Sequence, residues 1–221
     1  TWYHLVVTRK AGTRSRIYLN GTLVASDANT TNHTLPAGAN GLATIGAIKY
    51  SFTGSGGVLS DYCYLGSCFY GKIDALTTWS KELTSVEVTE LYNSGTGQEY
   101  PFTISNALIP SFNDAVGTNH GTRPSTTLSS GVLGPVFTTG KIGQAFQFDG
   151  INDYVSLPNT SGQFNFEGDF TISTWFRSSN LSASRYFMNN FQDNGTTWGY
   201  GWSFYYSGSL GFVFHLLNGA V

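Results

Sequence analysis

Short strand-like segments, separated by Gly and Asn turns, follow one another along almost the whole chain. In ten of them apolar residues alternate with polar ones or form short apolar runs, which is typical of β-strands. Between two of these segments Asn20 and Gly21 form a strong hairpin signal, because both residue types tolerate positive φ. The ten segments are His4–Thr8, Arg16–Asn20, Leu23–Ser26, Leu42–Ile48, Phe69–Trp79, Gln144–Phe148, Tyr154–Leu157, Phe170–Arg177, Trp202–Tyr206 and Leu210–Leu217.

One helix is expected, at Ser85–Tyr92. Thr84 can act as its N-cap, Glu87 can reach back to the cap, and Gly95 follows its end. A parallel βαβ fold needs several helices, which this pattern lacks. The sequence therefore predicts an all-β chain that forms an antiparallel two-sheet jelly-roll sandwich with one short helix.

Composition excludes several classes of partner. The 221 residues are enough for a sizeable core, and 11 basic against 13 acidic residues give a net charge of −2. Such a balance supplies no field to attract nucleic acid or an anionic membrane. The longest apolar stretch is interrupted by Gly211 and His215, so no membrane insertion is expected. Few charged residues and many Ser, Thr, Asn, Gly and aromatic residues suggest an extracellular or cell-surface protein.

The two cysteines, Cys63 and Cys68, enclose four residues in the sequence CYLGSC. This spacing can close a small disulfide loop, whereas a zinc site would need two more soft ligands nearby, and the four histidines are scattered. By analogy with secreted domains we expect a disulfide. The alternative is a loop with two reduced thiols.

Several motifs together resemble a laminin-G-like, concanavalin A-like domain. Residues 1–93 contain WYHLVVT, IYLNG and GKID, which look like the second half of such a domain. Residues 108–221 contain SFND, GQAFQFDG and FTISTWF, which look like its first half. The halves thus stand in inverted order, joined by a linker at 94–107, and together they equal one domain.

The inverted order has three explanations. The domain could be a circular permutant, one period of a tandem array, or a subunit that completes its neighbour by swapping halves. The last segment, Leu210–Leu217, would run into the first, His4–Thr8, as a hairpin. The linker could reach about 50 Å when extended, which suits all three. We favour the array or the swapped fibre.

No catalytic pair stands out among the acidic residues. The resemblance brings in glucanases, which carry two glutamates on one strand with both side chains facing the cleft. The five glutamates of this chain do not have that spacing within an aromatic strand; they are Glu82, Glu87, Glu90, Glu99 and Glu167. We therefore expect a domain that is not an enzyme, with calcium as its one candidate cofactor.

The resemblance implies a structural Ca²⁺ site. Asp74 and Asp114 occupy positions that border calcium in such domains, with Asn119 and the Gly121 carbonyl nearby. Asp74 is also an acid in an otherwise apolar strand, so it needs a partner. The alternative is an aspartate that holds a turn through hydrogen bonds.

A glycan platform is expected in the run WGYGW. Alternation places Trp198, Tyr200 and Trp202 on one side of a strand, with Asp193 and Asn194 in front of them. Exposed aromatic faces beside polar loops suit sugars. In the alternative interpretation these rings pack in the core or against a neighbouring domain.

The predicted function is a non-catalytic structural or adhesive repeat unit of an extracellular filament or large surface protein. Its partners would be copies of itself, assembled head to tail. The alternative is a Ca-dependent, lectin-like carbohydrate-binding module of a polysaccharide-degrading or adhesin protein, with glycans or surface proteins as partners.

Overall fold

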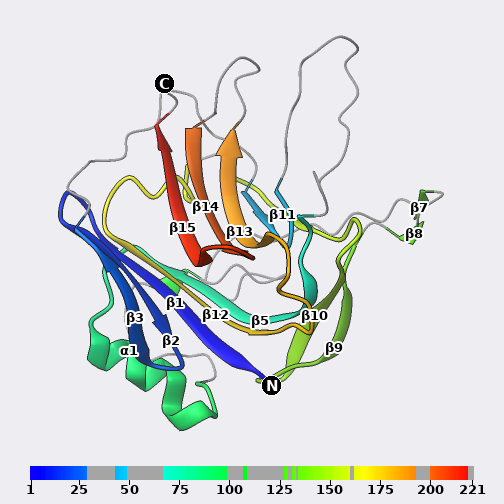
Figure 1. Cartoon of the computed structure of the whole chain (residues 1–221), viewed down its shortest axis with the longest axis horizontal. Helices are drawn as coiled ribbons and strands as arrows, with labels where there is room; N and C mark the ends of the chain where they lie inside the picture. The colour runs from blue at the N-terminus through cyan, green and yellow to red at the C-terminus, as the bar shows by residue number, and fades with distance from the viewer. Residues whose placement is uncertain are drawn as a thin grey trace.

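Two antiparallel β-sheets pack face to face in the computed structural model of the chain (Figure 1). The structure describes residues 1–28, 43–48, 67–98, 107–108, 127–128, 131–132, 134–159, 162–192 and 200–218. This is the antiparallel sandwich that the succession of short strands predicts.

The larger sheet has eight strands and the smaller sheet has five. In the larger sheet the order is β3 (Thr22–Asp27), β2 (Arg14–Leu19), β1 (Tyr3–Lys10), β12 (Phe170–Arg177), β5 (Tyr70–Trp79), β10 (Gln144–Asp149) and β9 (Val136–Thr139), and β6 (Ala107–Leu108) pairs with β5. The order in the smaller sheet is β11 (Val155–Leu157), β4 (Ala43–Ile45), β13 (Arg185–Gln192), β14 (Tyr200–Ser207) and β15 (Gly211–Asn218). Strands β7 (Thr127–Leu128) and β8 (Gly131–Val132) form a separate ribbon.

Strands from the two halves of the chain alternate within both sheets. In the larger sheet β12 lies between β1 and β5, and the pairing of Tyr3 with Phe176 joins the beginning of the chain to its last third. In the smaller sheet β4 lies between β11 and β13. One chain therefore builds one sandwich to which both halves of the chain contribute strands, while the inverted order of the halves relative to other domains of this kind stays a prediction.

The expected hairpin between the last and first strands does not form. Strand β15 pairs with β14 in the smaller sheet, whereas β1 pairs with β2 and β12 in the larger sheet. A hairpin needs two neighbouring strands of one sheet, so a connection between these two strands would have to cross from one sheet to the other.

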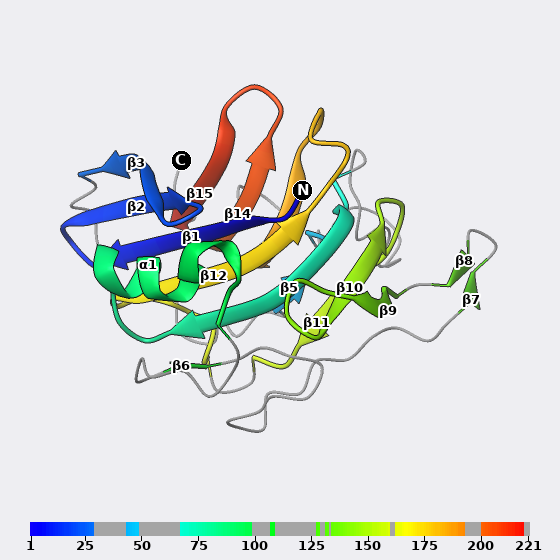
Figure 2. The ribbon, with the colours of Figure 1, turned by 90° about the horizontal axis from the view of Figure 1, so that it is seen from below.

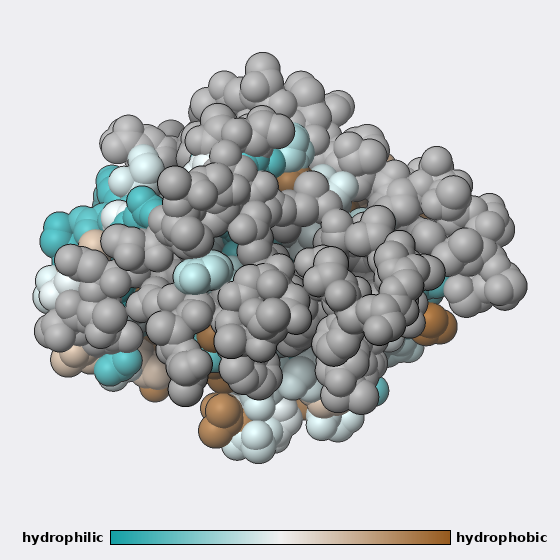
Figure 3. All heavy atoms as spheres, turned by 90° about the horizontal axis from the view of Figure 1, so that it is seen from above, coloured by the Kyte–Doolittle hydropathy of each residue, from teal (hydrophilic) through white to brown (hydrophobic). Residues whose placement is uncertain are grey.

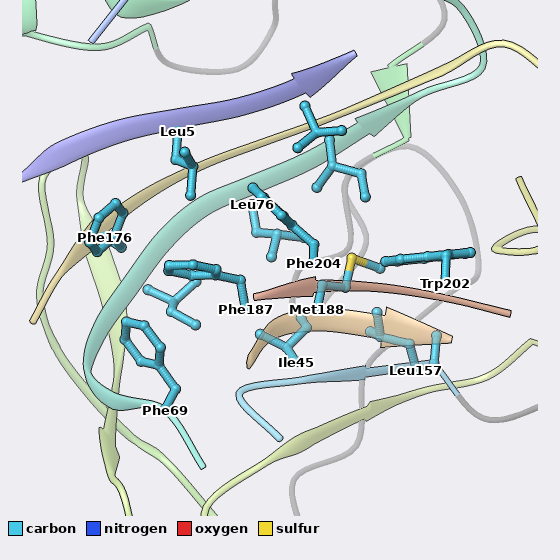
Figure 4. Close-up of a cluster of buried hydrophobic side chains, with 14 of the residues drawn as sticks. Leu5, Ile45, Phe69, Leu76, Leu157, Phe176, Phe187, Met188, Trp202 and Phe204 are labelled. Carbon is cyan, nitrogen blue, oxygen red and sulfur yellow. The ribbon is translucent and has the colours of Figure 1, made fainter. Parts of the chain in front are cut away.

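The core lies between the two sheets and is rich in aromatic rings (Figure 4). Alternate residues of each strand point inward, as the two-residue period of a strand requires. Its fully or almost fully buried members include Leu5, Ile45, Phe69, Phe148, Leu157, Phe170, Phe176, Phe187, Met188, Trp202 and Phe204.

The Asn20–Gly21 hairpin is confirmed. Asn20 has φ 50° and Gly21 has φ 76°, and they connect β2 to β3. A Cβ at position 21 would lie 3.1 Å from the Tyr92 ring, so glycine serves both the turn and the packing of the neighbouring helix.

The single helix α1 (Ser85–Tyr92) is confirmed with its capping box. The Thr84 hydroxyl accepts from the Glu87 backbone N–H, and the Glu87 carboxylate accepts from the Thr84 backbone N–H. The helix lies against the outer face of the larger sheet (Figure 2). It buries Val88 and Leu91 in a second apolar cluster with Val6, Tyr18, Trp79 and Leu83.

No helix in the described part of the chain has the length and apolar character to cross a membrane. On the face shown in Figure 3, the coloured hydrophobic side chains are scattered and form no continuous area. Single exposed apolar residues of this kind are normal on a folded protein.

Candidate functional site

A cleft of about 310 Å³ opens at one side edge of the sandwich. It lies between β2 and β3 of the larger sheet and β15 of the smaller sheet. Its volume is near the lower end of the range for ligand pockets, roughly 300–1,000 Å³. The lining residues are Ser15, Ile17, Ala25, Ser26, Asp27, Phe214, His215 and Leu216.

One part of the cleft is apolar because of the strand register. Ile17 and Ala25 lie opposite each other on β2 and β3, on the face that points toward the smaller sheet. Phe214 and Leu216 of β15 line the cleft from the other sheet. An aromatic side chain in such a position offers apolar surface to a ligand that is itself partly apolar.

A row of polar residues crosses the same face of the larger sheet, two residues along the strands from the pair Ile17 and Ala25. Arg9 pairs with Ser15, and Ser15 pairs with Asp27, so the three side chains share one face across β1, β2 and β3. Arg9 is fully buried, and its Nη1 donates to Ser15 Oγ over 3.2 Å. Burial lowers the pKa of Arg9, while the carboxylates of Asp169 and Asp27 act to raise it. The cleft is thus lined by an aspartate and a serine that are both linked to a buried cation.

His215 adds a further polar group. It lies on β15 next to Ser203 of β14 and lines the cleft together with its neighbours Phe214 and Leu216. Burial lowers the pKa of His215 from its usual 6.5, so the ring is neutral at pH 7. A neutral imidazole presents one hydrogen-bond donor and one acceptor.

These groups suit a polyhydroxylated ligand. The Asp27 carboxylate accepts hydrogen bonds, the Ser15 and Ser26 hydroxyls can donate or accept, and Phe214 offers an apolar surface. Asp27 is the one carboxylate among the described lining residues. Since hydrolysis of a glycosidic bond generally uses a pair of carboxyl groups, the arrangement fits binding better than cleavage.

Trp202 does not belong to an exposed platform, which corrects the expectation for this residue. It is fully buried between the sheets (Figure 4). Its Nε1 donates to the Phe164 carbonyl over 2.7 Å, and its ring stacks on Phe166 at 4.9 Å between centroids. The interpretation in which this ring packs in the core is correct for Trp202.

The other residues of the expected platform are not brought together in the described structure. Tyr200 is half-buried at the start of β14. Asp193, Asn194 and Trp198 lie outside the described residues. The platform as a whole stays a prediction, without Trp202.

Asp74 holds a turn. Its Oδ2 accepts from the backbone N–H groups of Lys141 and Ile142, over 2.6 and 2.8 Å, and its Oδ1 accepts from that of Ala75 over 2.7 Å. Burial raises the pKa of Asp74, and these three hydrogen bonds oppose that rise. The contacts of Asp74 therefore agree with the alternative interpretation, in which this aspartate holds a turn through hydrogen bonds.

The calcium site stays a prediction. Asp114, Asn119 and Gly121 lie outside the described residues, and the carboxylate of Asp74 is already occupied by three N–H groups. Within the part of the chain that the structure describes, no three His, Cys, Asp or Glu side chains come together as a metal site.

The disulfide also stays a prediction, because Cys63 lies outside the described residues. Cys68 is fully buried, and the described residues include no free cysteine.

Arg9, Ser15, Asp27 and His215 were not expected to be site residues. A signal for Arg9 is present: it continues the inward-facing series of Leu5 and Val7, so it is a charge at a core position. The cleft itself could not be found this way, because it joins strands from opposite ends of the chain.

Two packed antiparallel sheets with a short helix define the fold class as an antiparallel jelly-roll sandwich. Residues 1–89 match the family model of the Concanavalin A-like lectin/glucanases superfamily. No relative was found among the curated proteins. Laminin-G-like and concanavalin A-like domains are generally extracellular and typically serve as non-catalytic binding modules, although their superfamily includes glycosidases.

Proposed function

We propose that this domain is a non-catalytic, extracellular carbohydrate-binding module that binds a sugar in the cleft between β3 and β15. The observation that carries the proposal is the row Arg9–Ser15–Asp27, which ends in an open cleft lined by Phe214. Sugars have hydroxyl groups that donate and accept as well as apolar C–H faces, and the cleft offers partners for both.

The buried guanidinium strengthens this interpretation. Arg9 donates to the Ser15 oxygen, so the Ser15 O–H remains available to donate to a ligand. Arg9 and Asp27 interact electrostatically, so the Asp27 carboxylate belongs to the same charged row as the buried guanidinium. Hydrogen bonds to a charged carboxylate are stronger than those between neutral groups.

Asp27→Asn provides the test of the cleft. It removes the charge but keeps the size of the side chain, and we expect it to weaken binding by about 10- to 100-fold, since a hydrogen bond to a charged group contributes roughly 1.5–3 kcal/mol. Binding would be measured by affinity electrophoresis against a panel of polysaccharides, followed by calorimetry on the best ligand.

Asp169→Asn is the matched control. Asp169 is paired with Lys10 at 2.6 Å and, like Asp27, acts electrostatically on Arg9, but it does not line the cleft. This variant therefore removes an aspartate charge near Arg9 without removing a contact to the ligand. If Asp169→Asn weakens binding as much as Asp27→Asn, or if no polysaccharide binds the native domain, the cleft is not the site.

Calcium dependence is tested in the same assay. Binding in the cleft would use direct hydrogen bonds between the ligand and Ser15, Ser26, Asp27 and His215, so we expect EDTA to leave the dissociation constant unchanged. A loss of binding that added Ca²⁺ restores would instead support the Ca-dependent form of the proposal and the site predicted around Asp114.

A second candidate is a structural or adhesive repeat unit that associates with copies of itself. The observation that favours it is the edge strand β15. Among the described residues β15 pairs with β14 alone, in continuous register from Gly211 to Asn218, and it carries no Lys, Arg, Asp or Glu. Long edge strands without bulges or charges tend to pair with other chains.

Light scattering tests this second role. Concentration-dependent association that Val213→Lys abolishes would support self-pairing through β15, whereas a monomer at all concentrations would leave the carbohydrate-binding role alone.

A further inference from the structure

His4 lies on the outer face of the larger sheet, beneath the end of α1. Its ring is 5.0 Å from that of Trp175 on β12 and 6.0 Å from that of Tyr92, the last residue of the helix, as measured between centroids. Tyr92 and Trp175 also stack on each other at 5.8 Å. His4 is 1% exposed, so the helix end and the sheet enclose it.

The hydrogen bonds of His4 suit a neutral ring. Its Nε2 lies 2.8 Å from Ser173 Oγ, while its Nδ1 is buried without a hydrogen-bond partner. A protonated imidazole carries an N–H on both nitrogens, and the second one would have no acceptor here. Burial lowers the pKa of His4 from 6.5 to about 3.

The titratable groups around His4 do not stabilise a positive charge on its ring. Tyr92 belongs to α1 and Tyr18 to β2, and neither of these side chains is a carboxylate that could pair with a protonated His4. The Lys141 ammonium lies 5.2 Å from the centre of the Trp175 ring, and its positive charge opposes a second cation nearby. Asp74 of β5 lies opposite Trp175 of β12, but its carboxylate already accepts hydrogen bonds from backbone N–H groups, so it is not a partner for a protonated His4.

We propose that His4 makes the docking of α1 on the larger sheet sensitive to acid, so that protonation of this ring releases the helix and the turn that follows it. The turn is part of the same assembly. Gly97 is packed so closely against Ile142 and Trp175 that a Cβ would lie 2.6 Å from Ile142 Cδ1 and 3.2 Å from Trp175 Nε1. The segment from α1 to Gln98 also leads into the connection to the second half of the chain.

The direction of the effect follows from linkage. A released His4 has an ordinary pKa near 6.5 and binds a proton more readily than the docked ring, so acid favours release. The equilibrium constant for docking falls by up to about tenfold for each pH unit below 6.5, until pH nears 3.

Methyl NMR of the native domain between pH 7 and 4.5 tests the proposal. The methyl groups of Val88 and Leu91 report on the docked helix, and those of Leu5 and Val7 report on the core between the sheets. We expect the helix signals to move toward a released state as the pH falls, while the core signals keep their native positions. Helix signals unchanged at pH 4.5, or loss of both sets together, would overturn the proposal.

His4→Gln separates titration from packing. We expect its helix signals to be independent of pH, whereas the control His215→Gln keeps the acid response of the native domain. If His4→Gln does not fold, Lys141→Gln replaces it. Removal of this cation should shift the release to lower pH, and an unshifted midpoint would count against the proposed electrostatics.

Discussion

Trp202 shows how little residue type alone says about the role of an aromatic side chain. The alternation in WGYGW is compatible with an outward or an inward series, and the structure selects the inward one because Phe164 and Phe166 provide partners for the indole N–H and ring. Tyr200, two residues earlier, is expected on the same face of the strand as Trp202, but it is only half-buried because it lies at the beginning of the strand.

We expect Trp202→Ala to lower the free energy of unfolding by about 3–5 kcal/mol, because it leaves a cavity in the core and removes one of the two side-chain hydrogen bonds to the Phe164 carbonyl. Urea denaturation measures this. Tyr200→Ala is the control, and it should cost clearly less. A small effect of Trp202→Ala would contradict the buried position.

The capping box of α1 is the clearest local signal at the scale of an element. Thr84 and Glu87 exchange hydrogen bonds, and Lys81 also contacts the Glu87 carboxylate at 2.6 Å. Sequence alone predicts this helix because all the partners lie within a few residues of one another.

Thr84→Ala should lower the free energy of unfolding by about 1 kcal/mol, the usual cost of losing an N-cap. Chemical denaturation of this variant, compared with Thr89→Ala in the middle of the helix, distinguishes the cap from a general loss of a threonine. Equal effects of the two changes would speak against the capping box.

Asp74 connects two elements, since it lies on β5 and holds the loop between β9 and β10. Asp74→Ala would leave the Lys141 and Ile142 N–H groups without their acceptor, at a cost of about 1–3 kcal/mol for each buried group. Amide hydrogen exchange should show faster exchange at residues 140–143 than in the native domain. Unchanged protection of this loop would contradict the anchoring role.

Strand β13 marks the limit of pattern-based prediction at this scale. The sequence RYFMNNFQ does not alternate, and no strand was predicted there. A bulge between Tyr186 and Met188 turns both Phe187 and Met188 toward the core, and Asn189 and Asn190 are buried with hydrogen-bond partners for their amide N–H₂ groups. Tertiary contacts therefore decide what the local pattern cannot.

For the whole molecule, the predicted sandwich is confirmed and the inverted order of the halves stays a prediction, whereas the way in which strands of the two halves alternate in the sheets was not predicted. The predicted hairpin across the chain ends is wrong because sheet membership depends on contacts between distant segments. The cleft could not be predicted from the sequence for the same reason, because β15 approaches β2 and β3 only in the folded chain.

We expect neither 1–98 nor 107–221 to fold alone, because β1 and β5 need β12 between them. Each fragment should show no cooperative unfolding by circular dichroism, and an equimolar mixture should regain it. A stable sandwich from one fragment would contradict the alternation of strands.

The alternation of strands also means that some strands are synthesised long before the strands with which they pair. Strand β1 leaves the ribosome well before its partner β12, which begins only at Phe170. At about 5–20 residues per second, the nascent β1–β3 sheet waits on the order of ten to thirty seconds with one edge unpaired. During that interval the growing chain exposes an apolar strand that chaperones can bind and that other nascent copies can capture.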